Sequence, residues 1–282
     1  MEIIISGGSR LQYKTECIES AGNGIWNEDR ILIRNNLIGV IDGATPIHNF
    51  KYRGYSTMAE WLVDNFEKKI LAIPQKKEID YKIVSKNIIK QLEKDDFVSN
   101  LKNYDKPCFT SATLTLKNDN VLCQVIGDSY IYIQKKNGDI IELTDNRVDL
   151  YAAKTVKAVL QAKADKDNVA NVIEKQKIEN RKRMNVEGGY WVIGFEGEFE
   201  NEFLEMSYKE NEISKILICS DGFERLMKEF SLIDVKHLFS RKILLNEAML
   251  LLRHYEEENW IKDNYPCVKK SDDATAIMIS FI

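Results

Sequence analysis

The sequence has few of the ligands that bind soft metals. Only three histidines occur in 282 residues, and the five cysteines are scattered, with no CxxC pair. A histidine-rich or thiolate zinc site is therefore disfavoured, since such sites need clustered nitrogen or sulfur ligands. We interpret the cysteines as reduced, structural thiols of a cytoplasmic protein. They are Cys17, Cys108, Cys123, Cys219 and Cys267.

Long hydrophobic runs, an excess of positive charge and nucleotide-binding motifs are also missing. No apolar run approaches the roughly 20 residues that cross a bilayer, and the N-terminus lacks the pattern of a secretory signal. The formal net charge of −4 argues against a nucleic-acid-binding protein. Neither a G-x-x-x-x-G-K-S/T nor a G-x-G-x-x-G motif occurs. We therefore expect no membrane, nucleic-acid or nucleotide partner.

The apolar pattern predicts a mixed α+β fold. Strands are predicted at residues 1–14, 30–41, 109–118, 120–135, 190–193, 213–219 and 274–282. Helices are predicted from about Thr57, from about Asp80 to Leu92, and at about 223–230 and 244–259, with a helix-prone segment at 149–183. This order fits two central antiparallel sheets flanked by helices better than a doubly wound parallel sheet.

Acidic residues stand at the ends of several apolar, strand-like runs. Leu37–Ile41 precedes Asp42, and Ile216–Ser220 precedes Asp221. A carboxylate beside a buried strand is costly unless its charge is compensated, and converging carboxylates repel one another until cations join them. Oxygen-rich clusters of this kind suit Mg²⁺ or Mn²⁺. The full set of such residues is Glu28, Asp29, Asp42, Asp128, Asp221, Asp272 and Asp273.

Six short motifs that contain these residues occur in a fixed order along the chain. They are Asn27-Glu28-Asp29, Val40-Ile41-Asp42-Gly43, Thr110-Ser111-Ala112-Thr113, Gly127-Asp128-Ser129, Ser220-Asp221-Gly222 and Asp272-Asp273-Ala274-Thr275. Together they resemble the metal-dependent protein phosphatases of the protein phosphatase 2C type (PPM family), in a divergent bacterial-type form. The resemblance implies a single domain over residues 1–282, folded as a four-layer α-β-β-α sandwich with a two-metal site at one end of the sheets.

The resemblance also implies roles for individual residues. Asp42 would bridge two Mn²⁺ or Mg²⁺ ions, and the Gly43 carbonyl would bind one of them. Asp221 and Asp272 would bind the same metal, and Asp42 and Asp221 are the expected catalytic residues. Asp128 would belong to a weaker third metal site.

The acidic pair Glu28 and Asp29 matches the end of the first hairpin of the family. Glu28 is the better ligand candidate of the two, and Asp273 would support the ligands around it. The expected reaction is attack by a metal-activated water on phosphorus, without a phosphoenzyme.

The chain departs from the family where substrate phosphate is bound. No arginine occurs in residues 21–26, and the histidine proposed as a general acid is missing, with His48 four residues beyond its place. Tyr130 stands where the Gly-Asp-Ser motif usually ends in arginine, and Arg225 stands where many members are acidic. Such a cation should weaken a third metal site. Candidates to replace the missing arginine are Arg10, Arg30, Arg34 and Arg53. Arg53 is the most interesting because it follows the Asp42 loop, but a solvated arginine is the better explanation.

The segment at about 149–186 falls where the family carries a variable flap. Residues 150–185 contain nine Lys and Arg against four Asp and Glu, so this segment either steers a phosphorylated substrate or presents a solvated helical face. The function that we expect is a cytoplasmic, monomeric serine/threonine protein phosphatase with a cognate kinase. The alternatives are a catalytically weak module that binds a phosphoprotein or partner, and a phosphatase for a non-protein phosphate ester.

Overall fold

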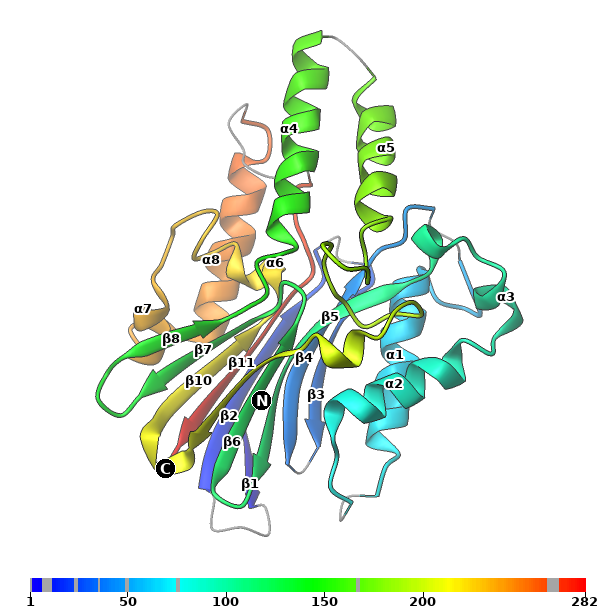
Figure 1. The fold of residues 1–282 in the computed structure, drawn as a ribbon. Coiled ribbons are helices and arrows are strands. Elements are labelled where there is room, and N and C mark those ends of the chain that lie inside the picture. Colours follow the sequence, from blue (N-terminus) through cyan, green and yellow to red (C-terminus); the bar gives the residue numbers. More distant parts are fainter. Residues whose placement is uncertain are drawn as a thin grey trace.

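Two antiparallel sheets face each other and carry helices on their outer faces, in a four-layer α-β-β-α arrangement (Figure 1). The computed structural model describes residues 2–6, 12–22, 25–34, 36–48, 51–74, 77–165, 168–262 and 269–282. Arg10 and Cys267 lie outside these residues. The predicted α+β sandwich is confirmed.

The first sheet has five strands in the order β3-β4-β5-β6-β9. Their bounds are β3 Asp29–Arg34, β4 Leu37–Ala44, β5 Cys108–Lys117, β6 Asn120–Ile126 and β9 Leu204–Lys209. The second sheet has six strands in the order β1-β2-β11-β10-β7-β8. Their bounds are β1 Glu2–Ser6, β2 Gln12–Ser20, β7 Tyr130–Lys135, β8 Ile140–Leu143, β10 Ile213–Cys219 and β11 Ala274–Phe281.

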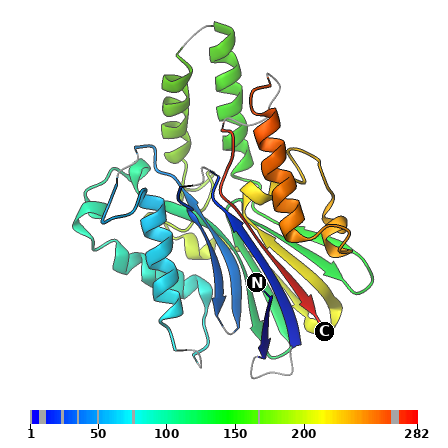
Figure 2. The same ribbon diagram turned by 180° about the vertical axis from the view of Figure 1, so that it is seen from behind.

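Helices α1 (Met58–Leu71) and α2 (Tyr81–Leu92) cover the five-stranded sheet, followed by the short α3 (Asp96–Ser99). The predicted starts of α1 and α2 are confirmed: the Thr57 side chain accepts from the Glu60 amide, and Asp80 caps α2. On the six-stranded sheet lie α6 (Asp221–Glu224), α7 (Val235–Phe239) and α8 (Leu245–Asn259) (Figure 2). Three 3₁₀ turns complete the assignment, at Asn103–Asp105, Phe199–Asn201 and Glu210–Glu212.

Buried apolar side chains fill each interface between layers. Val40 and Ile218 meet between the two sheets, Phe66 packs from α1 against Phe109 of β5, and Leu252 of α8 belongs to the cluster on the outer face of the second sheet. At roughly 25 cal/mol per Å² of apolar area removed from water, this burial holds the strand ends in fixed positions. The site described below is built on those ends.

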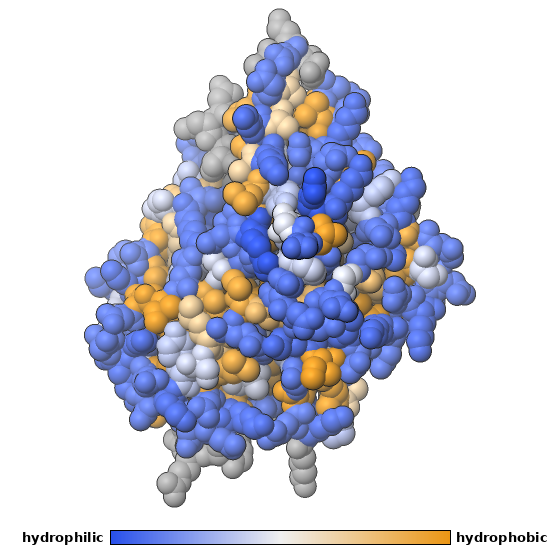
Figure 3. Space-filling model, viewed as in Figure 1, coloured by the Kyte–Doolittle hydropathy of each residue, from blue (hydrophilic) through white to orange (hydrophobic). Residues whose placement is uncertain are grey.

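The segment after β8 forms a helical hairpin of α4 (Asp149–Asp165) and α5 (Val169–Arg181), which projects from one end of the sandwich (Figure 1). Its base is anchored by a small apolar cluster that includes Cys108, Met184 and Tyr190. The helical prediction for 149–183 is therefore confirmed. This face of the molecule is largely hydrophilic, with separate hydrophobic patches (Figure 3).

Some predicted strands were wrong in extent. Residues 190–193 form isolated bridges only, with Ile193 paired to Phe109 and Tyr190 to Met184. Residues 120–135 form two strands, because Gly127 turns the chain with φ 78°. Strand β9 was missed since its side chains are mostly exposed and give no apolar alternation. Within the described residues, no helix is both long and apolar enough to cross a membrane.

Candidate active site

Strand pairing gathers the predicted acidic residues from distant parts of the sequence. Asp29 of β3 lies directly opposite Asp42 of β4. Asp221 lies two residues after the end of β10, and Asp272 lies two residues before β11. These two strands are antiparallel neighbours, with Cys219 opposite Ala276. Adjacent antiparallel strands end and begin at the same edge, so the two later aspartates meet there. Stacking of the sheets brings both pairs to one end of the sandwich.

Mutual repulsion among these carboxylates is evident from their pKa values. Burial, followed by Asp29, Asp221, Asp128 and Asp272, raises the pKa of Asp42 well above its usual range. Burial and Asp272 raise the pKa of Asp221, which shares a hydrogen bond with Asp42. Burial and Asp221 likewise raise the pKa of Asp128. All five residues therefore share one electrostatic environment, in which a divalent cation would be strongly favoured.

Among the described residues of the acidic centre, two buried carboxylate oxygens have no hydrogen-bond partner. Glu28 accepts a hydrogen bond from the Thr45 hydroxyl through Oε2, which leaves Oε1 without one. Asp29 accepts from Ser220 Oγ at 2.8 Å through Oδ2, which leaves Oδ1 without one. An orphaned buried carboxylate oxygen costs roughly 1–3 kcal/mol or more. A cation would satisfy both atoms, so these residues fit a hard divalent metal.

The acidic groups do not form a closed coordination shell. Among the described residues, no three of the His, Cys, Asp and Glu side chains lie close enough, as they stand, to hold one ion. Asp272 instead pairs with the ammonium group of Lys269, whose side chain is 58% exposed. The fit to a metal therefore rests on the oxygen donors, their shared repulsion and the two orphaned atoms.

Two glycines allow the acidic segments to approach one another closely. A Cβ atom at Gly43 would lie 2.6 Å from the carbonyl oxygen of Glu28, and one at Gly222 would lie 1.9 Å from that of Asp273. No other residue fits without displacing the backbone of a neighbouring segment. The sequence carries the signal, since each glycine directly follows Asp42 or Asp221, but only the structure reveals the contact.

Asp273 and Ser220 hold the acidic segments together. The two carboxylate oxygens of Asp273 accept from the backbone amides of Gly22 at 2.8 Å and Glu28 at 2.6 Å, in agreement with its predicted supporting position. Ser220 donates to Asp29 and accepts from the Thr275 amide at 3.0 Å. Sequence reasoning identified the motif around Ser220 but not this linking function of its hydroxyl.

His48 forms its contacts outside the acidic centre around Asp42. Its Nδ1 lies 2.8 Å from Asp105 Oδ1, and its Nε2 lies 3.5 Å from Glu174 of helix α5. The hydrogen bond with Asp105 raises the pKa of His48. The histidine thus connects the helical hairpin to the loop before β5, and its contacts give no support for a role as general acid.

The described candidates for a phosphate-binding arginine all have structural partners. Arg30 donates to the backbone carbonyls of Asn27 and Asp29. Arg34 is buried and donates to the carbonyl of Pro74, and Arg53 pairs with Asp95 at 2.8 Å. These contacts account for the three described candidates without substrate. Arg225, which the sequence analysis placed near the third metal site, pairs with Glu256 at 2.9 Å.

Arg181, at the end of α5, was missed by sequence reasoning. Its guanidinium donates to the carbonyls of Ala44 and Thr45, both at 3.1 Å, and to the sulfur of Cys108 at 3.0 Å. The hairpin is therefore bonded to the loop that directly follows Asp42 and Gly43. No local motif marks this arginine, because its partners are backbone atoms of a remote segment.

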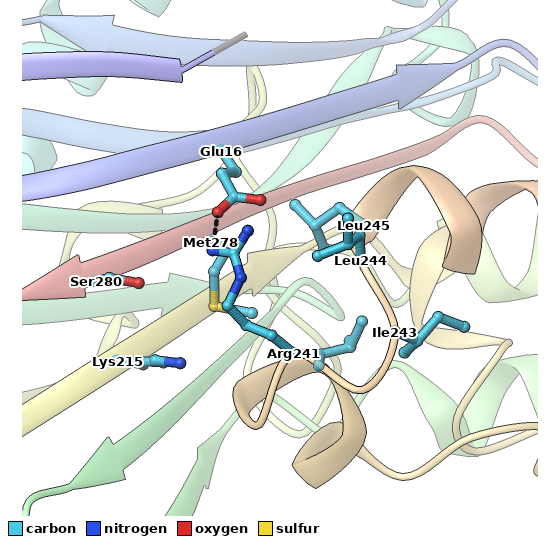
Figure 4. A pocket seen from close by; sticks show the side chains of 9 residues that line it. Glu16, Lys215, Arg241, Ile243, Leu244, Leu245, Met278 and Ser280 are labelled. Atoms are coloured by element: carbon cyan, nitrogen blue, oxygen red, sulfur yellow. Dashed lines mark hydrogen bonds and ion pairs between the residues drawn. The ribbon is translucent and has the colours of Figure 1, made fainter.

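A groove of about 710 Å³ opens between the helical hairpin and the body, and three acidic site residues line one end of it. They are Asp128, Asp221 and Asp272. Its size lies in the range of ligand-binding clefts. A second cavity under the loop between α7 and α8 measures only about 10 Å³, beside the Glu16–Arg241 ion pair (Figure 4). That space suits a single water at most. A larger cavity of about 840 Å³ lies beside Tyr81 and Thr115, and none of the predicted acidic residues lines it. The groove is therefore the better substrate site.

The same fold occurs in solved structures that include serine/threonine phosphatases. The serine/threonine phosphatase Stp1 from Staphylococcus aureus matches with a TM-score of 0.57 and 15% identity, over 98% of this chain and 97% of that one. PppA from Pseudomonas aeruginosa matches at 0.55 and 13%, over 99% of each chain. The catalytic domain of PstP, solved with two manganese ions, matches at 0.50 and 14%, over 96% of this chain and 99% of that one.

The fold and the acidic centre together define the class of metal-dependent phosphatases. The protein phosphatase 2C family model matches residues 19–259, and the chain belongs to that family. No curated protein matches the sequence significantly.

Proposed function

We propose that this protein is a Mn²⁺- or Mg²⁺-dependent phosphatase that acts on phosphoserine or phosphothreonine in proteins. The observation that carries the proposal is the convergence of strand-end carboxylates around Asp42, with buried oxygens of Glu28 and Asp29 left without partners. Family membership supports the phosphatase chemistry, and the metal-bound structure of PstP supports a need for manganese.

Two ions would be held by Asp42, the Gly43 carbonyl, Asp221, Asp272 and Glu28, with Asp29 beside them. Asp128 would serve a third ion. When bound, such ions supply Lewis-acid activation of a water and neutralise charge on the phosphoryl oxygens.

The chain's own contribution is to hold these oxygen donors in place before the metal arrives. Thr45 and Ser220 orient Glu28 and Asp29 through their hydroxyl groups. Gly43 and Gly222 keep the acidic segments in van der Waals contact. Preorganised ligands avoid the cost of ordering them at the moment of reaction.

The compartment and partners follow from the same reasoning. Four cysteines are free thiols, Cys17, Cys108, Cys123 and Cys219, which suits the reducing cytoplasm. A phosphoprotein substrate implies a cognate kinase that phosphorylates it. We propose that the enzyme acts as a monomer.

Hydrolysis of p-nitrophenyl phosphate and of a phosphothreonine peptide tests the proposal. Both assays are run with and without Mn²⁺, for wild type, Asp42→Asn and the control Asp139→Asn, which lies in the turn between β7 and β8. We expect metal-dependent turnover that Asp42→Asn abolishes and Asp139→Asn retains. The ratio of peptide to ester turnover then measures the preference for protein substrates.

Two results would overturn the proposal in different ways. Tight Mn²⁺ binding without turnover of either substrate would favour a phosphoprotein-binding module with little catalysis. Turnover of the small ester with no activity on phosphopeptides would favour a non-protein phosphate ester.

A further inference from the structure

The groove beside the acidic residues carries cations that the family resemblance does not assign. Lys177 lies on α5, and Lys269 lies in the segment before β11; both line the groove together with Asp221 and Asp272. In both ribbon views the segment before β11 reaches toward the base of the helical hairpin (Figures 1 and 2). The two lysines therefore face one space from two separate elements.

We propose that this groove binds the phosphorylated segment of the substrate, and that Lys177 and Lys269 contact its phosphoryl group. The proposal rests on the proposed function, because it assigns the phosphate-binding groups of the same site. The two lysines would replace the arginine that the sequence lacks at 21–26.

The position of Lys177 suits an anionic ligand. Its ammonium group has no hydrogen bond or ion pair with another described residue. Burial and the nearby charges of Lys269 and Arg181 lower its pKa, and the charge of Asp272 opposes them. Two like charges held close together repel each other, and a dianion between them relieves that repulsion. A phosphomonoester carries close to two negative charges at neutral pH.

The position of Lys269 links the phosphate to the reaction centre. Its ammonium group contacts the carboxylate of Asp272, and Asp221 lines the same groove. A phosphoryl group bound by this lysine would lie next to the acidic residues. A lysine on a flexible stem can contact phosphate without losing that carboxylate neighbour.

The remaining wall of the groove leaves room for a peptide. Helix α4 contributes the small side chains Ala152, Ala153 and Val156, and α5 contributes Ile173. The lining also has charged side chains of both signs: Asp149, Glu224, Arg225, Lys228 and Glu229. Tyr130 lies on the body side. A space of about 710 Å³ is larger than a phosphate ion requires, so residues flanking the phosphorylated side chain would contact this aliphatic wall.

Binding of a fluorescent phosphothreonine peptide to the Asp42→Asn protein, measured by anisotropy in Mn²⁺, tests this proposal without turnover. Lys177→Gln and Lys269→Gln are added singly and together to that background. Matched controls are Lys175→Gln, on another face of α5, and Lys270→Gln, which normally pairs with Glu257. Urea unfolding of each variant confirms that it is folded.

We expect each single change to weaken peptide binding about five- to tenfold, as for the loss of one hydrogen bond of ordinary strength in a half-open groove. The double change should weaken it further, Lys269→Arg should restore it, and both controls should stay within twofold. In the active enzyme, the same changes should raise KM and the inhibition constant of inorganic phosphate. The fold-change in kcat should be smaller than either.

Phosphopeptide binding within twofold of the parent for folded Lys177→Gln and Lys269→Gln would overturn the proposal, as would failure of the Asp42→Asn parent to bind the peptide. Lysine-dependent binding in a protein whose wild type shows no metal-dependent turnover would support this groove while refuting the proposed function. Metal-dependent turnover that is independent of both lysines would support the proposed function while refuting the assignment of the lysines.

Discussion

Replacing Gly222 by alanine tests whether close backbone contact builds the acidic centre. The new Cβ atom would lie 1.9 Å from the carbonyl oxygen of Asp273 and 3.0 Å from Cβ of Asp272. Ordinary carbon–oxygen contacts begin at about 3.3 Å, so the two segments must separate by about 1.4 Å. That movement would pull Asp272 away from Asp221 and strain the hydrogen bonds that Asp273 makes.

Two opposing terms decide the sign of the stability change. Alanine is favoured over glycine in a helix by about 1 kcal/mol, and Gly222 lies in α6. Overpacking of a well-filled site costs about 1–3 kcal/mol and more where backbone must move. Because Ser220 and Thr275 fix the neighbouring strands through hydrogen bonds at 3.0 Å, we expect the clash to win and the free energy of unfolding to fall by about 1–3 kcal/mol.

The assay is urea unfolding in EDTA, followed by tryptophan fluorescence, with a separate Mn²⁺ titration of the folded protein. Gly138→Ala is the matched control: its φ is 93° and a Cβ atom there would have no neighbour within 4 Å, so it should lose about 1 kcal/mol through backbone strain alone and bind Mn²⁺ normally. A Gly222→Ala protein as stable as wild type, with unchanged Mn²⁺ binding, would refute the reasoning.

Three further changes test other contacts. Ser220→Ala leaves a buried carboxylate without its donor and should lower the free energy of unfolding by about 1–3 kcal/mol; an unchanged urea midpoint would contradict this. Burial raises the pKa of Glu224 from 4.5 to about 8, so the folded protein keeps a proton that the unfolded chain releases, and stability falls as pH rises between these values. Urea unfolding at pH 5 and at pH 8 should therefore show that the stability of Glu224→Gln relative to wild type is greater at pH 8. The exposed control Glu187→Gln should show no such change. Because Arg181 holds the loop after Asp42 through the carbonyls of Ala44 and Thr45, Arg181→Gln should raise the Mn²⁺ concentration needed for half-maximal activity several-fold. The same Mn²⁺ requirement in Arg181→Gln and in the exposed control Arg183→Gln would contradict a contribution of the hairpin to the metal site.

The layered fold could be predicted from local apolar patterns, and the meeting of the acidic residues was implied by the family resemblance of the short motifs that contain them. An apolar strand that ends in an acidic residue is visible in a few letters, and antiparallel pairing then fixes which ends meet. The register of β3 and β4 is an example: Asp29 lies opposite Asp42, and a slip by one residue would turn one of them to the other face of the sheet. Strand β9 gave no such signal, because an exposed edge strand needs no alternating pattern.

Lys177 and Lys269 could not be singled out from the sequence, and the reason is physical. A carboxylate at a strand end is costly in the absence of a partner, so its presence in the sequence already indicates a special environment. A lysine on an exposed helix costs nothing, and Lys177 cannot be distinguished in sequence from Lys175. Only the groove between α5 and the body separates the two. The proposed lysines would be an example of substrate-binding groups that move between elements while the acidic centre keeps its motifs.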